Sequence, residues 1–147
     1  MASANPRLVG VYETVLYASD VAAATAFYSG VLGLRPVEEP DELGAAFRLG
    51  GGMLLLFHPE RASAPGRPVP SHGATGPAHV AFAVEPGGLD VFDAELRRRG
   101  IEIEREIEWD EGGRSLYVRD PAGNSVELIE GEAWPSSGDA ATETPRS

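Results

Sequence analysis

The feature that most constrains the fold is an internal repeat, because the order strand, helix, strand, strand, strand is predicted twice along the chain. In the first copy, apolar alternation predicts a strand over 9–18, and Asp20 is the expected N-cap of a helix that ends at Gly33. Three shorter strands are predicted after this helix, over 34–38, 45–49 and 53–57.

The second copy begins after a stretch that is rich in Pro and Gly. A strand is predicted over 78–84, and a helix is expected to open at Gly88 and to close at Gly100. Alternation of Ile with Glu then predicts a strand over 101–109. The last two strands, over 115–119 and 125–129, flank the turn Asp120-Pro121-Ala122-Gly123-Asn124.

The repeat indicates an α+β protein made of tandem βαβββ modules. One short module cannot bury a face of its sheet alone, so we expect the modules to pair and form a curved mixed sheet around a central cavity. The predicted organisation is a first module over 8–58, a linker loop over 59–76, a second module over 77–130 and a flexible tail over 131–147.

The composition excludes several kinds of chemistry. The chain has no Cys, which rules out disulfides and thiolate catalysis, and all 12 basic residues are Arg, which rules out Schiff-base chemistry on Lys. A net charge of −11 argues against nucleic acid as a partner, because phosphate binding needs a basic surface. No apolar run could span a bilayer and no secretory signal is recognisable, so we expect no membrane association and a cytoplasmic location.

Three candidate metal ligands fall at repeat-related positions. Glu13 and His79 are equivalent residues on the first strand of each module, and Glu127 is equivalent to Leu55 on the last strand. If a pseudo-two-fold axis relates the modules, these side chains approach one central point. Imidazole nitrogen and carboxylate oxygen bind divalent metals, so the sequence predicts a metal site of Glu13, His79 and Glu127. The competing interpretations are a satisfied core histidine at His79 and, at Glu127, a carboxylate at the sheet edge that is hydrogen-bonded to the backbone.

The segments around these residues resemble the vicinal-oxygen-chelate superfamily. That superfamily includes glyoxalase I, extradiol dioxygenases, fosfomycin-resistance enzymes and bleomycin-resistance proteins. The motifs of the first module are at 13–20, 27–28 and 31–34, and those of the second module are at 76–82 and 120–128. Their order and spacing extend the resemblance over nearly all of 9–130.

The resemblance implies a homodimer, with modules paired within a chain or exchanged between chains. It also implies a metal-dependent lyase, dioxygenase or transferase that acts on a small oxygen-bearing substrate. Family members usually have His or Gln where this chain has Glu13, and the glyoxalase-type fourth ligand is a carboxylate where this chain has Leu55. A site of two carboxylates and one imidazole favours Mn, Mg or Fe, with Ni and Zn as further candidates.

His72 and Tyr117 are the catalytic candidates. His72 precedes the flexible Gly73 and could swing over the site as an acid or base. Tyr117 is predicted on the strand next to that of Glu127, where it could donate a hydrogen bond to a bound oxygen. An exposed loop histidine and an ordinary strand aromatic are the alternative interpretations.

Two other functions are compatible with the sequence. The first is a metal-free protein that sequesters an aromatic or antibiotic-like molecule in a cavity lined by aromatic side chains. The candidates for that lining are Tyr12, Tyr17, Phe57, Phe82, Trp109 and Tyr117. The second is a subunit with a vestigial cavity whose role is dimerisation. Metal content distinguishes these functions from the enzyme.

Overall fold

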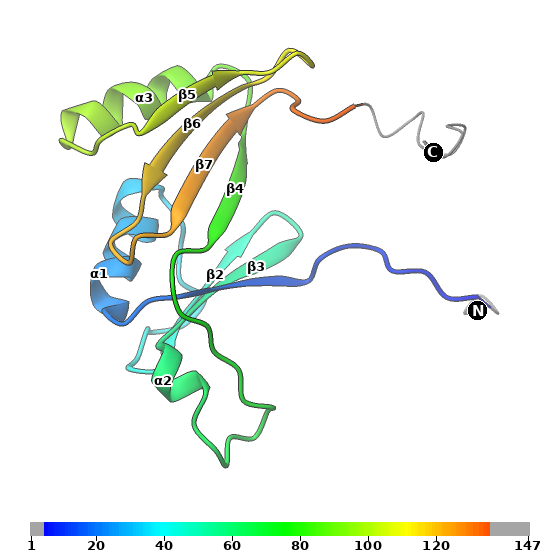
Figure 1. Cartoon of the computed structure of the whole chain (residues 1–147), viewed down its shortest axis with the longest axis vertical. Helices are drawn as coiled ribbons and strands as arrows, with labels where there is room; N and C mark the ends of the chain where they lie inside the picture. The colour runs from blue at the N-terminus through cyan, green and yellow to red at the C-terminus, as the bar shows by residue number, and fades with distance from the viewer. Residues whose placement is uncertain (1–4, 136–147) are drawn as a thin grey trace. The chain divides into compact units, whose positions relative to one another are not determined.

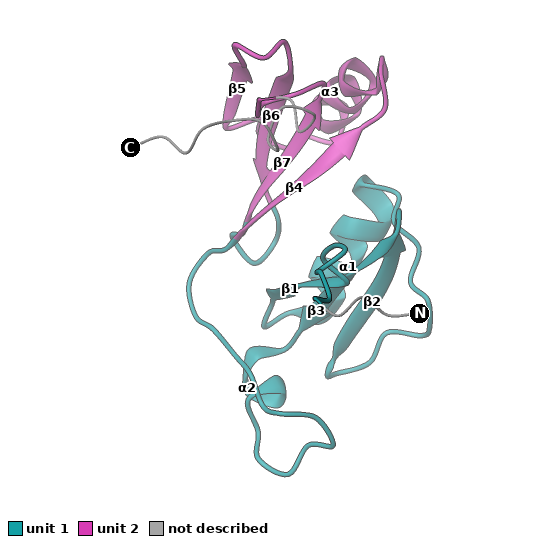
Figure 2. Ribbon diagram, turned by 90° about the vertical axis from the view of Figure 1, so that its right-hand side faces the viewer, with its two compact units in different colours: residues 1–78, 120–124 teal, residues 79–119, 125–147 magenta. Residues whose placement is uncertain are grey.

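The computed structural model describes residues 5–135 and confirms the α+β class. The chain divides into two compact units, which Figure 2 shows in two colours. Unit 1 comprises 1–78 together with the short segment 120–124, and unit 2 comprises 79–119 and 125–147. Among the described residues, no helix has the length and apolarity needed to cross a membrane.

Unit 1 is built on a mixed three-stranded sheet in the order β1-β3-β2. β3 lies in the middle, parallel to β1 and antiparallel to β2 (Figure 1). The bounds of the elements of unit 1 are β1 Glu13–Tyr17, α1 Val21–Ala26, the π-helix η1 Phe27–Val31, β2 Gly44–Leu49, β3 Gly52–Phe57 and α2 Pro59–Ala62.

The helical segment of unit 1 begins where the sequence predicts. The Asp20 side chain accepts a hydrogen bond from the Ala23 backbone N–H at 2.9 Å, which satisfies one of the free donors of the first turn of α1. α1 contacts β2 and β3, and the alternate strand residues Leu16, Leu54 and Leu56 are buried. The opposite face of the sheet carries Glu13, Val15 and Leu55, which alternate with those buried residues.

Unit 2 is built on a mixed four-stranded sheet in the order β4-β7-β6-β5. β4 is parallel to the central strand β7, and the other pairs are antiparallel. α3 covers one face of this sheet (Figure 1), where Leu89 and Leu96 are fully buried with Leu116 and Val126. The bounds of the elements are β4 His79–Val84, α3 Gly88–Arg98, β5 Arg105–Glu108, β6 Arg114–Arg119 and β7 Ser125–Glu130.

Three strand predictions are wrong in extent. The segment 34–38 forms only an isolated bridge between Pro36 and Phe47, because a proline has no N–H to donate to a ladder. The strand predicted over 101–109 is reduced to β5, because its partner β6 ends at Arg119 and leaves 101–102 without residues to pair with. β1 likewise starts at Glu13 rather than at residue 9, because its partner β3 begins at Gly52.

The segment predicted as a linker, 59–76, contains the short helix α2. The backbone N–H of His72 donates to the Ala62 carbonyl at 3.0 Å, so the later part of this segment lies against the end of α2. The prediction of a flexible tail over 131–147 lies mostly outside the described residues.

Candidate metal centre

The strand registers align the two halves of the repeat residue by residue. In unit 1, Glu13 pairs with Met53 and Val15 pairs with Leu55. In unit 2, His79 pairs with Ser125 and Ala81 pairs with Glu127. Glu13 is therefore equivalent to His79, and Leu55 to Glu127, as the sequence repeat predicts.

His79 and Glu127 lie side by side on the face of the unit 2 sheet opposite α3. The His79 Nε2 is 3.3 Å from the Glu127 Oε1. The other ring nitrogen, Nδ1, is 3.1 Å from the backbone carbonyl oxygen of Ser125. Because a carbonyl oxygen can only accept, Nδ1 carries the proton of this hydrogen bond. In the neutral ring, Nε2 therefore presents a lone pair to Glu127.

The second carboxylate oxygen of Glu127 is already engaged. The Ser115 hydroxyl donates to the Glu127 Oε2 at 2.6 Å, and Ser115 is completely buried. Two acceptors, the His79 Nε2 and the Glu127 Oε1, thus face each other across a short gap. A proton or a cation is needed between them, and a nitrogen and an oxygen donor are the pair that a divalent metal accepts.

Tyr117 belongs to the same cluster. Its ring stacks on His79 with the centroids 6.2 Å apart and the planes at 19°. Burial and a hydrogen bond to the Glu127 carboxylate raise the pKa of the Tyr117 hydroxyl above its ordinary value. Tyr117 is therefore protonated at neutral pH and acts as a hydrogen-bond donor.

Of the three predicted ligands, only Glu127 is buried, with 7% of its surface exposed. Glu13 and His79 are exposed in their units. The reason is topological, because each is the first residue of an edge strand, β1 or β4, whereas Glu127 lies on the central strand β7.

Glu13 lies in unit 1, whereas His79 and Glu127 lie in unit 2. Within residues 5–135, neither unit by itself groups three His, Cys, Asp or Glu side chains close enough to hold a metal ion. Within unit 2, the candidate ligands that lie together are His79 and Glu127.

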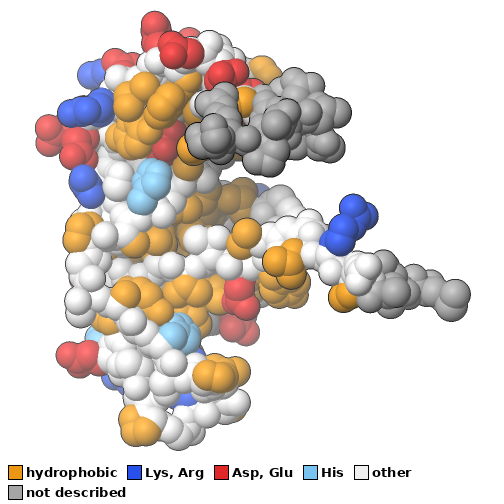
Figure 3. Space-filling model, turned by 45° about the vertical axis from the view of Figure 1, so that its right-hand side comes forward, with side chains coloured by type: hydrophobic (Ala, Val, Ile, Leu, Met, Phe, Trp, Pro, Cys, Tyr) orange, Lys and Arg blue, Asp and Glu red, His pale blue; other side chains and the backbone are white. Residues whose placement is uncertain are grey.

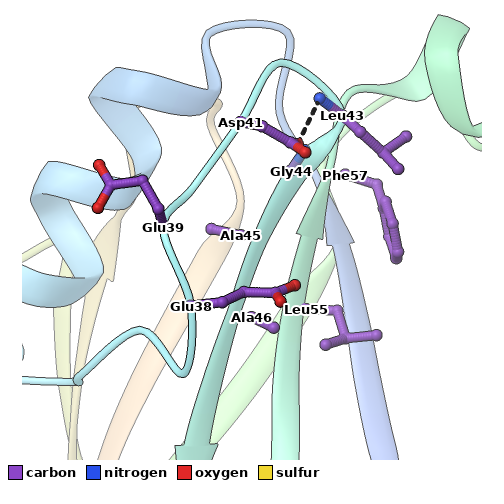
Figure 4. Close-up of a pocket in the computed structure, with 9 residues that line it drawn as sticks. All are labelled: Glu38, Glu39, Asp41, Leu43, Gly44, Ala45, Ala46, Leu55 and Phe57. Atoms are coloured by element: carbon purple, nitrogen blue, oxygen red, sulfur yellow. Dashed lines mark hydrogen bonds between the residues drawn. The ribbon is translucent and has the colours of Figure 1, made fainter.

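The position equivalent to Glu127 in unit 1 has no carboxylate. Leu55 lines an open pocket of about 260 Å³ on the exposed face of β2 and β3. Figure 4 shows the Glu38 side chain reaching over Ala46 toward Leu55, whereas Glu39 points away. Asp41 is occupied with its own loop, because its carboxylate accepts the Leu43 N–H at 2.9 Å. The floor of this pocket is apolar and its rim is acidic.

His72 is held at the opposite end of β1 from Glu13. Its Nδ1 lies 2.6 Å from the Tyr17 hydroxyl, and its ring meets Phe57 edge-on with the centroids 4.9 Å apart. Tyr17 is four residues from Glu13, which corresponds to roughly 13 Å along a strand. The contact between Tyr17 and His72 was not predicted from the sequence. Alternation does place Tyr17 on the same face of β1 as Glu13.

A second buried network organises the turn between β6 and β7. The Tyr28 hydroxyl donates to the Asp120 Oδ2 at 2.7 Å, and the Asn124 side-chain amide donates to the same oxygen at 2.9 Å. The Asn124 Oδ1 accepts the Ala78 N–H at 2.8 Å, directly before β4. This turn therefore fixes Ala78 and Asn124, the residues that directly precede β4 and β7 in the sequence. The sequence predicts the turn from its turn-forming residues, but it does not predict the contact of the turn with Tyr28.

Comparison with known proteins identifies the family of the chain. The sequence profile of the Glyoxalase/Bleomycin resistance protein/Dioxygenase superfamily matches residues 10–128. The chain belongs to this superfamily. The match extends over both copies of the repeat and confirms the resemblance seen in the motifs.

Individual members of the superfamily share the fold and part of the sequence. The metallothiol transferase FosB of Shouchella clausii is 30% identical over 130 residues, which cover 83% of this chain and 80% of that protein. The crystal structure of a lactoylglutathione lyase from Agrobacterium tumefaciens is 39% identical with a TM-score of 0.80, covering 86% of this chain and 97% of that one. A glyoxalase/dioxygenase from Nostoc punctiforme is 26% identical with a TM-score of 0.64, covering 88% and 99%.

Proposed function

We propose that this chain is a divalent-metal-dependent enzyme that acts on a small oxygen-bearing substrate. His79 and Glu127 are two of its metal ligands, and Glu13 is the third. The observation that carries the proposal is the 3.3 Å approach of the His79 Nε2 to the Glu127 Oε1. The second polar atom of each side chain is held by Ser125 or Ser115, so both acceptors remain directed at one point.

The donor set is suited to a metal of intermediate or hard character. A neutral imidazole whose other nitrogen donates to a backbone carbonyl is the usual form of a metal-binding histidine. A buried carboxylate is costly without a cationic partner, and Glu127 is 7% exposed. Glu13 is proposed as the third ligand because of its register equivalence to His79. Two carboxylates and one imidazole favour Mn, Mg or Fe over softer metals.

The side chains around this point have distinct chemical roles. When bound, a divalent cation would serve as a Lewis acid toward neighbouring substrate oxygens. Tyr117 keeps its proton at neutral pH, and its hydroxyl would turn from Glu127 to donate this proton to a substrate oxygen that develops negative charge. His72 is a second candidate for proton transfer, from the Tyr17 end of β1.

The unit 1 half of the repeat supports a choice among the reaction classes of the superfamily. A lyase of the four-ligand glyoxalase type needs a carboxylate where this chain has Leu55, so that chemistry is disfavoured. Addition to a small electrophile, or ring cleavage with oxygen, needs only three protein ligands. The similarity to a metallothiol transferase supports the first of these, a group transfer.

The test is metal analysis of protein that is purified without a chelator. We expect about one divalent ion per chain, which is lost in His79→Ala and Glu127→Ala and retained in Glu102→Ala, where a solvent-exposed carboxylate is removed. Glu13→Ala should lose most of the metal if it completes the site. A metal-free wild-type protein that binds an aromatic ligand tightly would instead establish the sequestering function.

We also propose that the functional protein is a homodimer. Both β1 and β4 lie at an edge of their sheets, and the edge of a sheet is where a strand of another chain can pair. The segment before β1 also exposes apolar side chains to solvent (Figure 3), among them Leu8, Val11 and Tyr12. Light scattering at micromolar concentration tests this proposal, and a monomeric mass would contradict it.

A further inference from the structure

The Glu127 carboxylate is the end of a hydrogen-bond chain that begins at Trp109. The Trp109 indole Nε1 lies 2.8 Å from the Ser115 Oγ, and that hydroxyl lies 2.6 Å from the Glu127 Oε2. An indole N–H can only donate and an ionised carboxylate can only accept. These hydrogen bonds therefore have one possible direction. The Trp109 indole N–H donates to the Ser115 hydroxyl, and the single hydroxyl proton of Ser115 points at Glu127.

The hairpin between β5 and β6 holds Trp109 in place over Ser115. Ile107 pairs with Ser115, and Trp109 is two residues farther along on the same face. The backbone N–H of Trp109 donates to the Gly113 carbonyl at 2.8 Å, which closes the turn of the hairpin. The Gly113 N–H in turn donates to the Glu132 carbonyl at 2.9 Å, so the end of the hairpin is tied to the segment after β7.

The hydrogen bond between Ser115 and Glu127 is shielded from water. Ser115 is completely buried and Glu127 is 7% exposed, whereas Trp109 is half-buried. A charge-assisted hydrogen bond in such surroundings is strong and directional. It holds the Oε2 of Glu127 and leaves the Oε1 as the oxygen directed at His79.

We propose that Trp109 and Ser115 are positioning residues that orient Glu127 for metal binding through one oxygen. The inference rests on the proposed function, because it assigns a role to the second oxygen of a proposed ligand. Neither residue would touch the metal. Without the Trp109 indole N–H, the Ser115 hydroxyl is free to turn, and without the Ser115 hydroxyl, the Glu127 Oε2 loses the donor that holds it, although the Tyr117 hydroxyl still contacts the carboxylate.

The test compares Trp109→Phe, which keeps an aromatic ring but removes the N–H, with Ser115→Ala. Trp134→Phe is the matched control, because Trp134 is 80% exposed. Mn²⁺ affinity is measured by competition with a chelator, and the visible absorption spectrum of bound Co²⁺ reports on its ligands. Circular dichroism confirms that each variant is folded, and the half-buried Trp109→Phe keeps the test valid if Ser115→Ala does not fold.

We expect Ser115→Ala to weaken Mn²⁺ binding by about 10- to 100-fold, as is typical when a partner of a metal ligand is lost. Trp109→Phe should weaken it less, and both variants should change the Co²⁺ spectrum while Trp134→Phe does not. Ser115→Thr, which restores the hydroxyl, should recover the wild-type spectrum. Wild-type affinity and spectra in both Trp109→Phe and Ser115→Ala would overturn the positioning role and leave the proposed function standing. A wild-type protein that binds neither ion would overturn the proposed function as well.

Discussion

Leu55 and Glu127 occupy the same register position in the two sheets. Leu55 pairs with Val15, two residues after Glu13, and Glu127 pairs with Ala81, two residues after His79. The two halves of the repeat therefore present chemically different side chains at one structural position. In the proposed metal site, this difference leaves three protein ligands rather than four.

If Leu55 faces the metal, Leu55→Glu should tighten Mn²⁺ binding by about tenfold, because an added carboxylate increases the charge of the ligand set. Leu49→Glu is the matched control, since Leu49 is 43% exposed at the end of β2. The measurement is chelator competition on both variants and the wild type. Equal affinities for Leu55→Glu and the wild type would show that residue 55 is remote from the metal.

The Tyr28→Phe substitution should destabilise the protein by about 1.5–3 kcal/mol, because it removes a buried hydrogen bond to a charged acceptor. Tyr28 is fully buried and its hydroxyl donates to Asp120 at 2.7 Å. Urea denaturation measures the loss, with the 78% exposed Tyr12→Phe as control. If Tyr28→Phe and Tyr12→Phe are equally stable, Asp120 is satisfied without Tyr28.

Gly113→Ala should destabilise unit 2 by about 1–3 kcal/mol through overpacking. A Cβ at residue 113 would lie 2.5 Å from the Glu132 carbonyl oxygen, which is backbone and cannot turn away. Gly10→Ala is the control, because a Cβ there has no neighbour within 4 Å. Thermal unfolding measures the difference, and an unchanged melting temperature would mean that the hairpin end shifts freely.

Glu95 should contribute a pH-dependent part of the stability in acid. Hydrogen bonds from Arg98 and Arg99 lower the pKa of the Glu95 carboxyl from 4.5 to about 2. A depressed pKa stabilises the folded state above pH 4.5, and this stabilisation is lost as the pH falls toward 2.

Glu95→Gln should therefore flatten the decrease of the unfolding free energy between pH 4.5 and 2, whereas the solvent-exposed Glu102→Gln should not. The comparison is made by urea denaturation across this range. High salt should reduce the effect, because these charges lie at the surface. Parallel pH profiles of wild type and Glu95→Gln at low salt would show that the ion pairs do not persist in solution.

Much of the fold follows from local sequence signals. Asp20 caps α1 because its carboxylate reaches the Ala23 N–H of the first turn. α3 exposes a polar face because its apolar residues recur at helical spacing. The strand predictions fail at their ends, since the length of a strand is decided by its partner. Residues 9–12 alternate well but extend past the start of β3 at Gly52.

The sequence likewise predicts part of the candidate site, and the tertiary structure is needed for the rest. The repeat predicts Glu13, His79 and Glu127 as equivalent or adjacent positions, and the strand registers agree with that equivalence. Local sequence contains no sign that Trp109 donates to Ser115 or that Tyr17 meets His72. These contacts depend on how the hairpin and the loop fold back over the sheets.

The sequence by itself determined the α+β class, the repeated order of elements and the types of donor available, because periodicity, capping and residue chemistry are local properties. Only the tertiary structure decided that Ser115 holds the Oε2 of Glu127 while the Oε1 faces His79. The physical reason is that the direction of a hydrogen bond depends on which donors and acceptors meet in space, and β6 and β7 meet only once the sheet has formed.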